Sequence, residues 1–161
     1  MQNYTSKNTS LHQIARIYKN PASAKYLRDK FILDIGGGKY NDAAYYAFNE
    51  LHSLVHVYDK YNRDEDDNRF VLQFDNYHVA ILSNVLNVID DREERIALLI
   101  MAKMKAKMTL ISVYEGDRSG VGKVSKKDCY QLNRKLEDYI DEVNEVFGTC
   151  EKKNGFILAI S

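Results

Sequence analysis

The sequence predicts an α/β protein of three layers, with a mostly parallel sheet between two layers of helices. Short apolar runs of strand length alternate with segments whose apolar residues recur at helical spacing, which is typical of parallel strands joined by crossover helices. The chain has 161 residues, a single proline and no internal repeat, so no linker divides it. We therefore expect one domain over residues 1–161, with helices in 1–29 ahead of a core in 30–161.

The composition narrows the possible functions. With 45% hydrophobic and 29% charged residues, the chain has the make-up of a soluble globular protein. Lys plus Arg and Asp plus Glu both number 23, so no overall basic field supports nucleic-acid binding, although local patches stay open. Cys129 and Cys150 lack metal-ligand or disulfide spacing, and no signal-like or membrane-spanning apolar run occurs. These features favour a cytoplasmic protein that has no membrane partner.

The first 29 residues predict two short helices. Residues 1–9 are polar, and we expect them to be loose. Ser10 and Gln13 have the spacing of a capping box, which predicts a first helix. Its apolar stripe would consist of Leu11, Ile14, Ile17 and Tyr18. Asn20 and Pro21 suit the cap and first position of a second helix, running through about Arg28.

The stretch FILDIGGGKYND, residues 31–42, organises the core. An apolar run of strand length ends at Asp34, three glycines follow (Gly36, Gly37 and Gly38), and Asn41 stands where a helix could start. Glycines between a buried strand and a helix N-terminus let the backbone approach a ligand closely. This pattern predicts a loop that binds a nucleoside cofactor.

The glycine pattern indicates which cofactor. A dinucleotide fingerprint G-x-G-x-x-G fits Gly36 and Gly38 but meets Asn41 at its third glycine, which weakens the nicotinamide and flavin interpretations. The remaining LDIGGG resembles the first motif of the class I S-adenosylmethionine-dependent methyltransferases. The alternative is a plain glycine turn. The resemblance implies a reduced, Rossmann-like methyltransferase fold in which the three glycines hold the methionine end and Asp34 supports the loop or meets the cofactor's amino group.

A second strand, residues 54–59, ends in a candidate ribose ligand. Asp59 lies 23 positions past Gly36, and a carboxylate at the end of the second strand can accept hydrogen bonds from both ribose hydroxyls of a nucleoside above the glycine loop. The alternative is an aspartate that merely favours the turn. Seventeen residues separate Asp59 from Tyr77, too few for a full crossover and another strand. The family's third strand is therefore expected to be shortened or missing, and Asp75 is the remaining candidate for the adenine ring.

The segment after Asp59 and the next strand leave two further points open. The acidic run 62–68 suits a solvated loop or helix start, and RFVLQF suits either a short helix or a strand. Residues 78–83 read as a buried strand, whose end faces the transferred methyl group in the resembled family. Asn84 would border that methyl group, or it is a turn residue. No proline follows it, which argues against methylation of base amino groups.

The second half predicts further strands and helices. Asp91 and Glu94 form a capping box for a helix through Met104, and residues 109–115 form a strand. The face of that helix against the sheet would consist of Ile96, Leu99, Ile100 and Met104. Ser125 and Asp128 predict the start of a long helix that Gly148 ends. Its stripe would consist of Cys129, Leu132, Leu136, Tyr139, Ile140, Val143 and Phe147, and residues 155–160 form a last strand.

The loop from Glu115 to Lys123 allows several interpretations. It only partly matches a phosphate-binding P-loop, because Gly116 and Gly122 are one residue too far apart and Val124 follows the lysine. A basic substrate loop and a plain flexible connection are the alternatives. The basic residues involved would be Arg118, Lys123, Lys126 and Lys127.

Over residues 32–148 the chain also resembles methyltransferases associated with DNA phosphorothioation systems, through NVLNVIDDREER and YIDEVNEVFG. We therefore expect an S-adenosylmethionine-dependent methyltransferase of undefined acceptor that binds S-adenosylmethionine or S-adenosylhomocysteine. Methyl transfer from a sulfonium mainly needs in-line placement, so no catalytic residue is expected to stand out. The first alternative is a non-catalytic interaction module on the same fold, with a possible homodimer. The second is a nucleotide hydrolase that uses Gly116 to Lys123.

Overall fold

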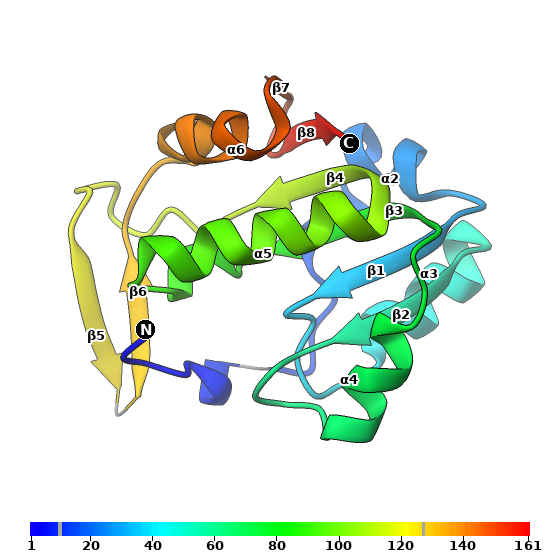
Figure 1. Cartoon of the computed structure of the whole chain (residues 1–161), viewed down its shortest axis with the longest axis horizontal. Helices are drawn as coiled ribbons and strands as arrows, with labels where there is room; N and C mark the ends of the chain where they lie inside the picture. The colour runs from blue at the N-terminus through cyan, green and yellow to red at the C-terminus, as the bar shows by residue number, and fades with distance from the viewer. Residues whose placement is uncertain (10, 127) are drawn as a thin grey trace.

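The computed structural model describes residues 1–9, 11–126 and 128–161. One sheet of six strands in the order β2-β1-β3-β4-β8-β7 forms the centre (Figure 1). The first four strands are parallel, and β8 runs antiparallel to both of its neighbours. The strands are β1 (Phe31–Ile35), β2 (Leu54–Tyr58), β3 (Tyr77–Ser83), β4 (Ala106–Ser112), β7 (Cys150–Lys152) and β8 (Ile157–Ile160).

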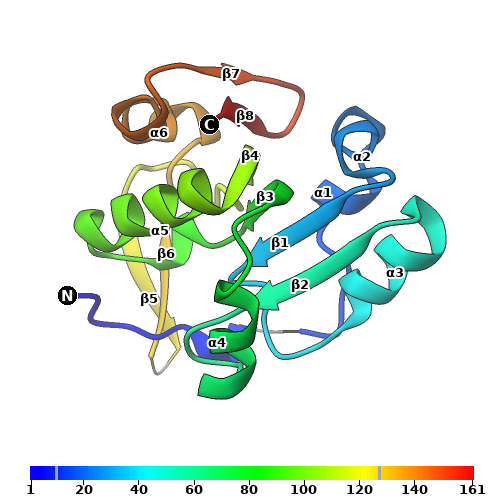
Figure 2. The same ribbon diagram turned by 45° about the vertical axis from the view of Figure 1, so that its right-hand side comes forward.

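Helices cover both faces of this sheet (Figure 2). On one face lie α1 (Arg16–Lys19), α2 (Pro21–Leu27) and α3 (Asp42–Leu51). On the other lie α4 (Glu65–Leu72), α5 (Arg92–Lys105) and α6 (Ile140–Phe147). A separate hairpin pairs β5 (Gly122–Lys126) with β6 (Cys129–Leu132), and short 3-10 turns are η1 (Lys7–Thr9), η2 (Leu86–Val88) and η3 (Leu136–Tyr139).

Strand alternation divides the core into two clusters. In β3, Val79 and Ile81 pack toward α1–α3, whereas Ala80 and Leu82 pack toward α5 and α6; all four are fully buried. This is the pattern of a strand that is buried on both faces. The predicted three-layer fold with a mostly parallel sheet is therefore confirmed.

Several predicted helix boundaries hold. The side chain of Asn20 accepts a hydrogen bond from the backbone N–H of Ala22, and Pro21 opens α2. Asp91 accepts from the N–H groups of Glu93 and Glu94 at the start of α5. The segment 65–72 is helical and β2 is an outer strand, so the third strand of the resembled family is missing, as expected.

The first helix and the inner face of α5 differ from the prediction. Described residues 11–15 are not helical, and α1 begins only at Arg16; Ser10, the expected cap, and Lys127 lie outside the described residues. On α5, Ile96 and Leu99 are buried as expected, but Ile100 and Met104 are 45% and 72% exposed. Arg95 and Ala102 take the inward positions instead.

The predicted long helix from Asp128 to Phe147 is wrong. Its first part is strand β6, and only η3 and α6 are helical. The apolar spacing also fits a four-residue strand followed by a turn, which explains the error. Gly148 ends α6 with φ +85°, as predicted. The strand β7 was not foreseen. Among the described residues, no helix is long and apolar enough to cross a membrane.

Candidate cofactor site

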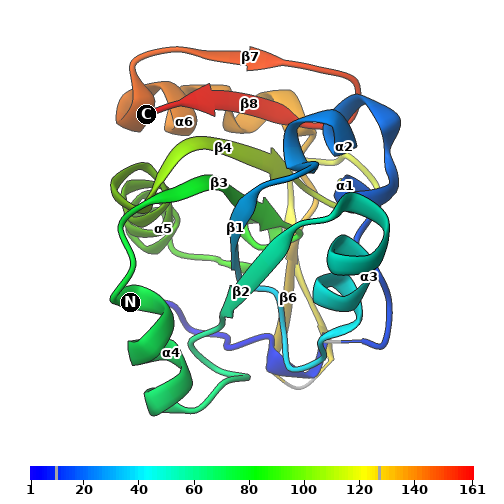
Figure 3. The same ribbon diagram turned by 90° about the vertical axis from the view of Figure 1, so that its right-hand side faces the viewer.

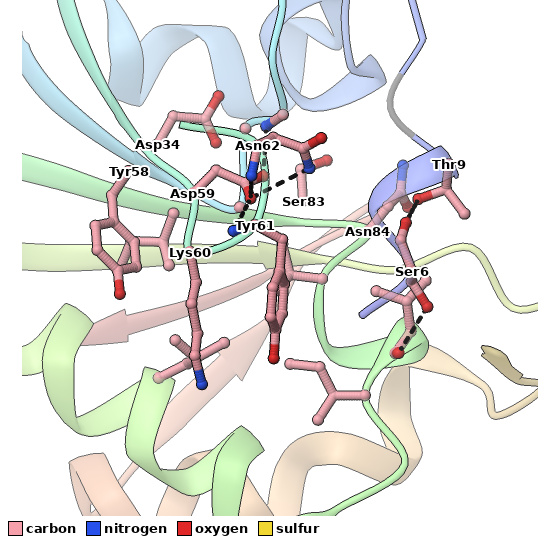
Figure 4. Close-up of a pocket in the computed structure, with 18 of the residues that line it drawn as sticks. Ser6, Thr9, Asp34, Tyr58, Asp59, Lys60, Tyr61, Asn62, Ser83 and Asn84 are labelled. Atoms are coloured by element: carbon pink, nitrogen blue, oxygen red, sulfur yellow. Dashed lines mark hydrogen bonds between the residues drawn. The ribbon is translucent and has the colours of Figure 1, made fainter. Parts of the chain in front are cut away.

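A cavity of about 200 Å³ lies at the carboxyl ends of β1, β2 and β3. This is where parallel α/β sheets bind ligands, next to the point where strand order reverses. Its floor comes from the glycine bend after β1 and the turn after β2, and its far wall comes from the N-terminal segment (Figure 4). Of the predicted site residues, the cavity is lined by Asp34, Gly36, Gly37, Gly38, Asp59 and Asn84.

Packing explains the absence of side chains in the glycine bend. The N–H of Gly36 donates to the carbonyl of Tyr58 at 2.7 Å, which joins the bend to the end of β2. A Cβ on Gly36 would lie 2.5 Å from Val85 Cγ2, and one on Gly37 would lie 2.9 Å from Asp34 Cγ. Gly36 also has φ +76°. The bend is therefore held close to β2 and β3 and keeps its backbone at the cavity wall.

The carboxylate of Asp59 faces this bend. One oxygen, Oδ2, accepts from the N–H of Gly38 at 2.9 Å, and the other, Oδ1, accepts from the N–H groups of Tyr61 and Asn62 at 3.0 and 2.9 Å. The residue is only 7% exposed. The glycine bend and the aspartate that closes β2 thus line one space.

Asp34 is a buried carboxyl group at the same end of β1. The hydroxyl of Tyr18, on α1, donates to Asp34 Oδ2 at 2.7 Å. Burial raises the pKa of Asp34 to about 6, against the opposing effect of the Tyr18 hydrogen bond. The same burial raises the pKa of Tyr18 well above its ordinary value. The sequence indicated Tyr18 only as a core residue on a helix stripe.

Arg63 fixes the outer side of the glycine bend, and sequence reasoning missed it. Its Nε donates to the carbonyl of Gly38 at 2.8 Å, and its NH2 donates to the carbonyl of Tyr40 at 3.1 Å and to Asn41 Oδ1 at 2.8 Å. Asn41, at the N-cap of α3, therefore binds Arg63 and makes no side-chain cap. A lone arginine inside the acidic run 62–68 was the only available signal.

Two predicted residues have contrasting positions. Asn84 follows β3, lines the cavity and has a left-handed backbone with φ +58°, which asparagine tolerates better than most residues. Asp75 does not join the site. It lies at the amino end of β3, whereas the cavity lies at the carboxyl ends of the strands, and it pairs with Lys105. Residues 65–72 form the helix α4, so no strand follows β2 to carry such a residue to the cavity.

The N-terminal segment forms the far wall, so the expectation that it is loose is wrong. Ser6 donates its N–H to the carbonyl of Asp128 at 2.9 Å, and its Oγ accepts from the N–H of Tyr130 at 3.1 Å. The ring of Tyr4 stacks on Tyr130 with centroids 5.6 Å apart. From this segment the cavity receives Gln2, Thr5, Ser6, Thr9, Leu11 and Gln13.

The loop from Glu115 to Lys123 has no P-loop geometry. It leads into strand β5, whereas a P-loop leads into a helix N-terminus that binds the phosphates. Lys123 pairs with Asp117, and a Cβ on Gly116 would overlap Asn133 Oδ1 at 1.7 Å. The nucleotide hydrolase alternative has no site in this loop.

Comparisons with known proteins address the fold. No family model and no curated protein matches the sequence. Among solved structures, the 1,6-didemethyltoxoflavin-N1-methyltransferase of Burkholderia thailandensis, with bound 1,6-didemethyltoxoflavin and S-adenosylhomocysteine, matches with a TM-score of 0.65 at 16% identity. The match covers 88% of this chain and 77% of that chain.

A second similar structure is the N-terminal domain of EvdMO1, determined in the presence of S-adenosylhomocysteine and D-fucose. It matches with a TM-score of 0.58 at 11% identity, over 94% of this chain and 85% of that chain. At such low identities the likeness concerns the fold. The chain therefore has the methyltransferase-type α/β fold that its glycine motif predicts.

Proposed function

We propose that the chain is an S-adenosylmethionine-dependent methyltransferase and binds its cofactor in the cavity above the glycine bend. The observation that carries this proposal is the joint placement of the bend and Asp59: the carboxylate accepts from Gly38 across the floor of the cavity. Two structures of the same fold contain, or were determined with, S-adenosylhomocysteine, which supports the cofactor class. The resemblance to phosphorothioation-associated proteins stays a prediction, and the acceptor stays undefined.

The donor and acceptor groups of the site fit a nucleoside cofactor. Asp59 Oδ2 accepts one hydrogen bond, from the N–H of Gly38, and a carboxylate oxygen can accept two, so it has capacity for a ribose hydroxyl. Gly36 and Gly38 leave the backbone of the bend accessible for the methionine end, and Asp34 lies beneath them for its amino group. Asn84 borders the opposite side.

The cofactor itself supplies the activated methyl group, and the protein supplies placement. Residues of the N-terminal segment close the side of the cavity opposite the bend. This wall limits the directions from which an acceptor can reach the methyl group.

Calorimetric titration with S-adenosylhomocysteine tests the proposal. We expect the wild-type protein to bind it, and Asp59→Asn to bind it roughly 10- to 100-fold more weakly, because an amide replaces the charged acceptor of a ribose hydroxyl. Asp75→Asn is the matched control and should bind as wild type does, since Asp75 lies away from the cavity. Thermal unfolding of both variants separates lost binding from lost folding. A folded wild-type protein that does not bind millimolar S-adenosylhomocysteine contradicts the proposal.

A further inference from the structure

The outer strand β2 leaves one edge of the sheet open. It is hydrogen-bonded to β1 on one side only, and Figure 3 shows this edge facing the viewer between α3 and α4. Leu54 donates its N–H to Lys30 and Tyr58 accepts from Gly36, so the even-numbered residues direct their backbone groups toward β1. The N–H and C=O groups of Val55 and Val57 therefore point outward.

The opening has a defined length. At the next outward-facing position, Asp59, the side chain of Asn68 replaces a neighbouring strand: Oδ1 accepts from the Asp59 N–H and Nδ2 donates to the Asp59 carbonyl, both at 3.0 Å. Within the described part of the chain, no residue bonds the outward backbone groups of Val55 and Val57. Two residues thus offer four unpaired backbone groups.

This edge lacks the features that keep strands from pairing with other molecules. Edge strands are usually protected by a lysine, a proline or a bulge. The strand LVHVY contains no lysine or proline, and its register with β1 is unbroken, so it has no bulge. A groove lined by Val55, His56 and Val57 runs along it. Large apolar side chains flank the groove and are more than half exposed: Tyr45 and Phe48 on α3, Leu54, and Phe70 on α4.

We propose that two copies of the chain pair through β2 as antiparallel strands, related by a two-fold axis through His56. The strand is symmetric in chemistry about that residue, since Val55 would face Val57 of the second copy and Leu54 would face Tyr58. In this register the four outward groups of each copy meet complementary groups of the other. The interface is isologous and joins the two sheets into one.

Charge and apolar exposure favour a second copy as the occupant. The strand LVHVY carries no Lys, Arg, Asp or Glu, so no like charges lie opposite each other within the proposed strand pair. The axis is perpendicular to the sheet, which brings α3 of both copies to the same face. Tyr45 and Phe48, each 66% exposed, would then be covered by their own counterparts. This inference does not depend on cofactor binding.

Light scattering after size exclusion provides the first test. The wild-type protein should elute with twice the mass of the chain at high micromolar concentration. The double variant Tyr45→Lys/Phe48→Lys should elute as a monomer, because four positive charges would meet at the axis. Met104→Lys is the matched control: it is 72% exposed on α5, away from β2, and should stay dimeric. If the wild-type protein is a monomer, the proposal is wrong. This holds even if the β2 edge then pairs with a strand of another protein.

Disulfide trapping tests the register. In the non-hydrogen-bonded pair at the axis, the two His56 Cα atoms would lie about 4.5 Å apart, within disulfide range. His56→Cys, in a Cys150→Ser background, should form a covalent dimer under mild oxidation. Leu54→Cys should not, although it is at an exposed position, because its counterpart would lie roughly 13 Å away along the strand. Equal cross-linking of both variants, or faster cross-linking of Leu54→Cys, contradicts the proposed pairing.

Discussion

Two regions enclose the cavity, and different kinds of contact hold them. The cradle, residues 31–63, is tied by contacts of modest sequence separation: Asp59 and Arg63 bind Gly38 from 21 and 25 positions away. The cap consists of residues 1–9, four of which line the cavity, and of the strands β5 and β6, to which these residues are bound. Its contacts join Thr5 to Asp128 and Ser6 to Tyr130, which are 123 and 124 positions apart. The structure of the cradle can be predicted from nearby residues in the sequence. The cap forms only through contacts between distant parts of the folded chain.

The largest expected effect concerns the buried polar network between α5 and α6, outside both regions. Glu142 on α6 accepts from Arg95 Nε and NH2 and from Arg134 NH1, each at 2.9 Å, and the Arg95 and Glu142 side chains are 6% exposed. Glu142→Ala leaves a buried guanidinium without its partner, so we expect the free energy of unfolding to fall by about 3–5 kcal/mol. Urea denaturation measures it.

The matched control for this network is Glu145→Ala. Glu145 pairs with Arg92 on the same helix pair, but its side chain is 51% exposed, so the loss should stay below about 1 kcal/mol. Similar losses for the two variants would mean that the buried network does not stabilise the fold.

The second largest expected effect concerns the cradle, where a substitution should raise the free energy of unfolding. Burial raises the pKa of Asp34 to about 6 from an ordinary value of 3.8, so the folded state binds the proton more tightly than the unfolded state. Between these values the wild-type protein therefore loses stability as pH rises. Asp34→Asn removes that loss, keeps an acceptor for Tyr18, and should be more stable at pH 7 by about 3 kcal/mol.

Urea denaturation from pH 4 to pH 7 measures this effect. The difference between Asp34→Asn and the wild type should grow across the range and level off above pH 6. A constant difference would show that the carboxyl group does not titrate there. If Asp34 binds a ligand, a carboxylate is expected beneath the glycine bend even though it destabilises the fold.

Local signals carried most of the cradle prediction. Strand length, the three glycines and a carboxylate at the end of the next strand are all visible within residues 31–59. Tyr18 and Arg63 were not foreseen as site residues, because their roles depend on which atoms the folded chain brings to them. Asp75 was misplaced relative to the site because residues 65–72 form a helix and not a strand, so this position lies at the amino end of β3, away from the cavity.

The structure of the cap could not be predicted from the sequence, for two physical reasons. Residues 1–9 have no apolar period, and their order comes from hydrogen bonds to a hairpin more than 120 residues away. The strand β6 has only four residues, and its apolar positions Cys129 and Leu132 also match helical spacing. Short strands paired outside the main sheet give too little alternation to be distinguished from a helix.

A smaller effect should follow from removing a single cap contact. Ser6 is 3% exposed, and its Oγ accepts from the Tyr130 N–H and donates to the Val88 carbonyl at 3.3 Å. Ser6→Ala leaves both backbone groups without this partner and should lower the free energy of unfolding by about 1–2 kcal/mol. Hydrogen exchange should accelerate in 1–9 and 129–132 but not in 31–35. Uniform acceleration would show that cap and cradle unfold together.

The smallest effect should come from Asp75, the predicted site residue that lies outside both regions. Its carboxylate is 74% exposed and pairs with Lys105, so solvent and salt screen the interaction. Asp75→Asn should change the free energy of unfolding by less than about 1 kcal/mol, and high salt should abolish the difference. A change of several kcal/mol would mean that this end of β3 contributes to stability as the buried network does. The contrast between a locally stabilised cradle and a cap held by distant contacts would then not account for the stability of the chain.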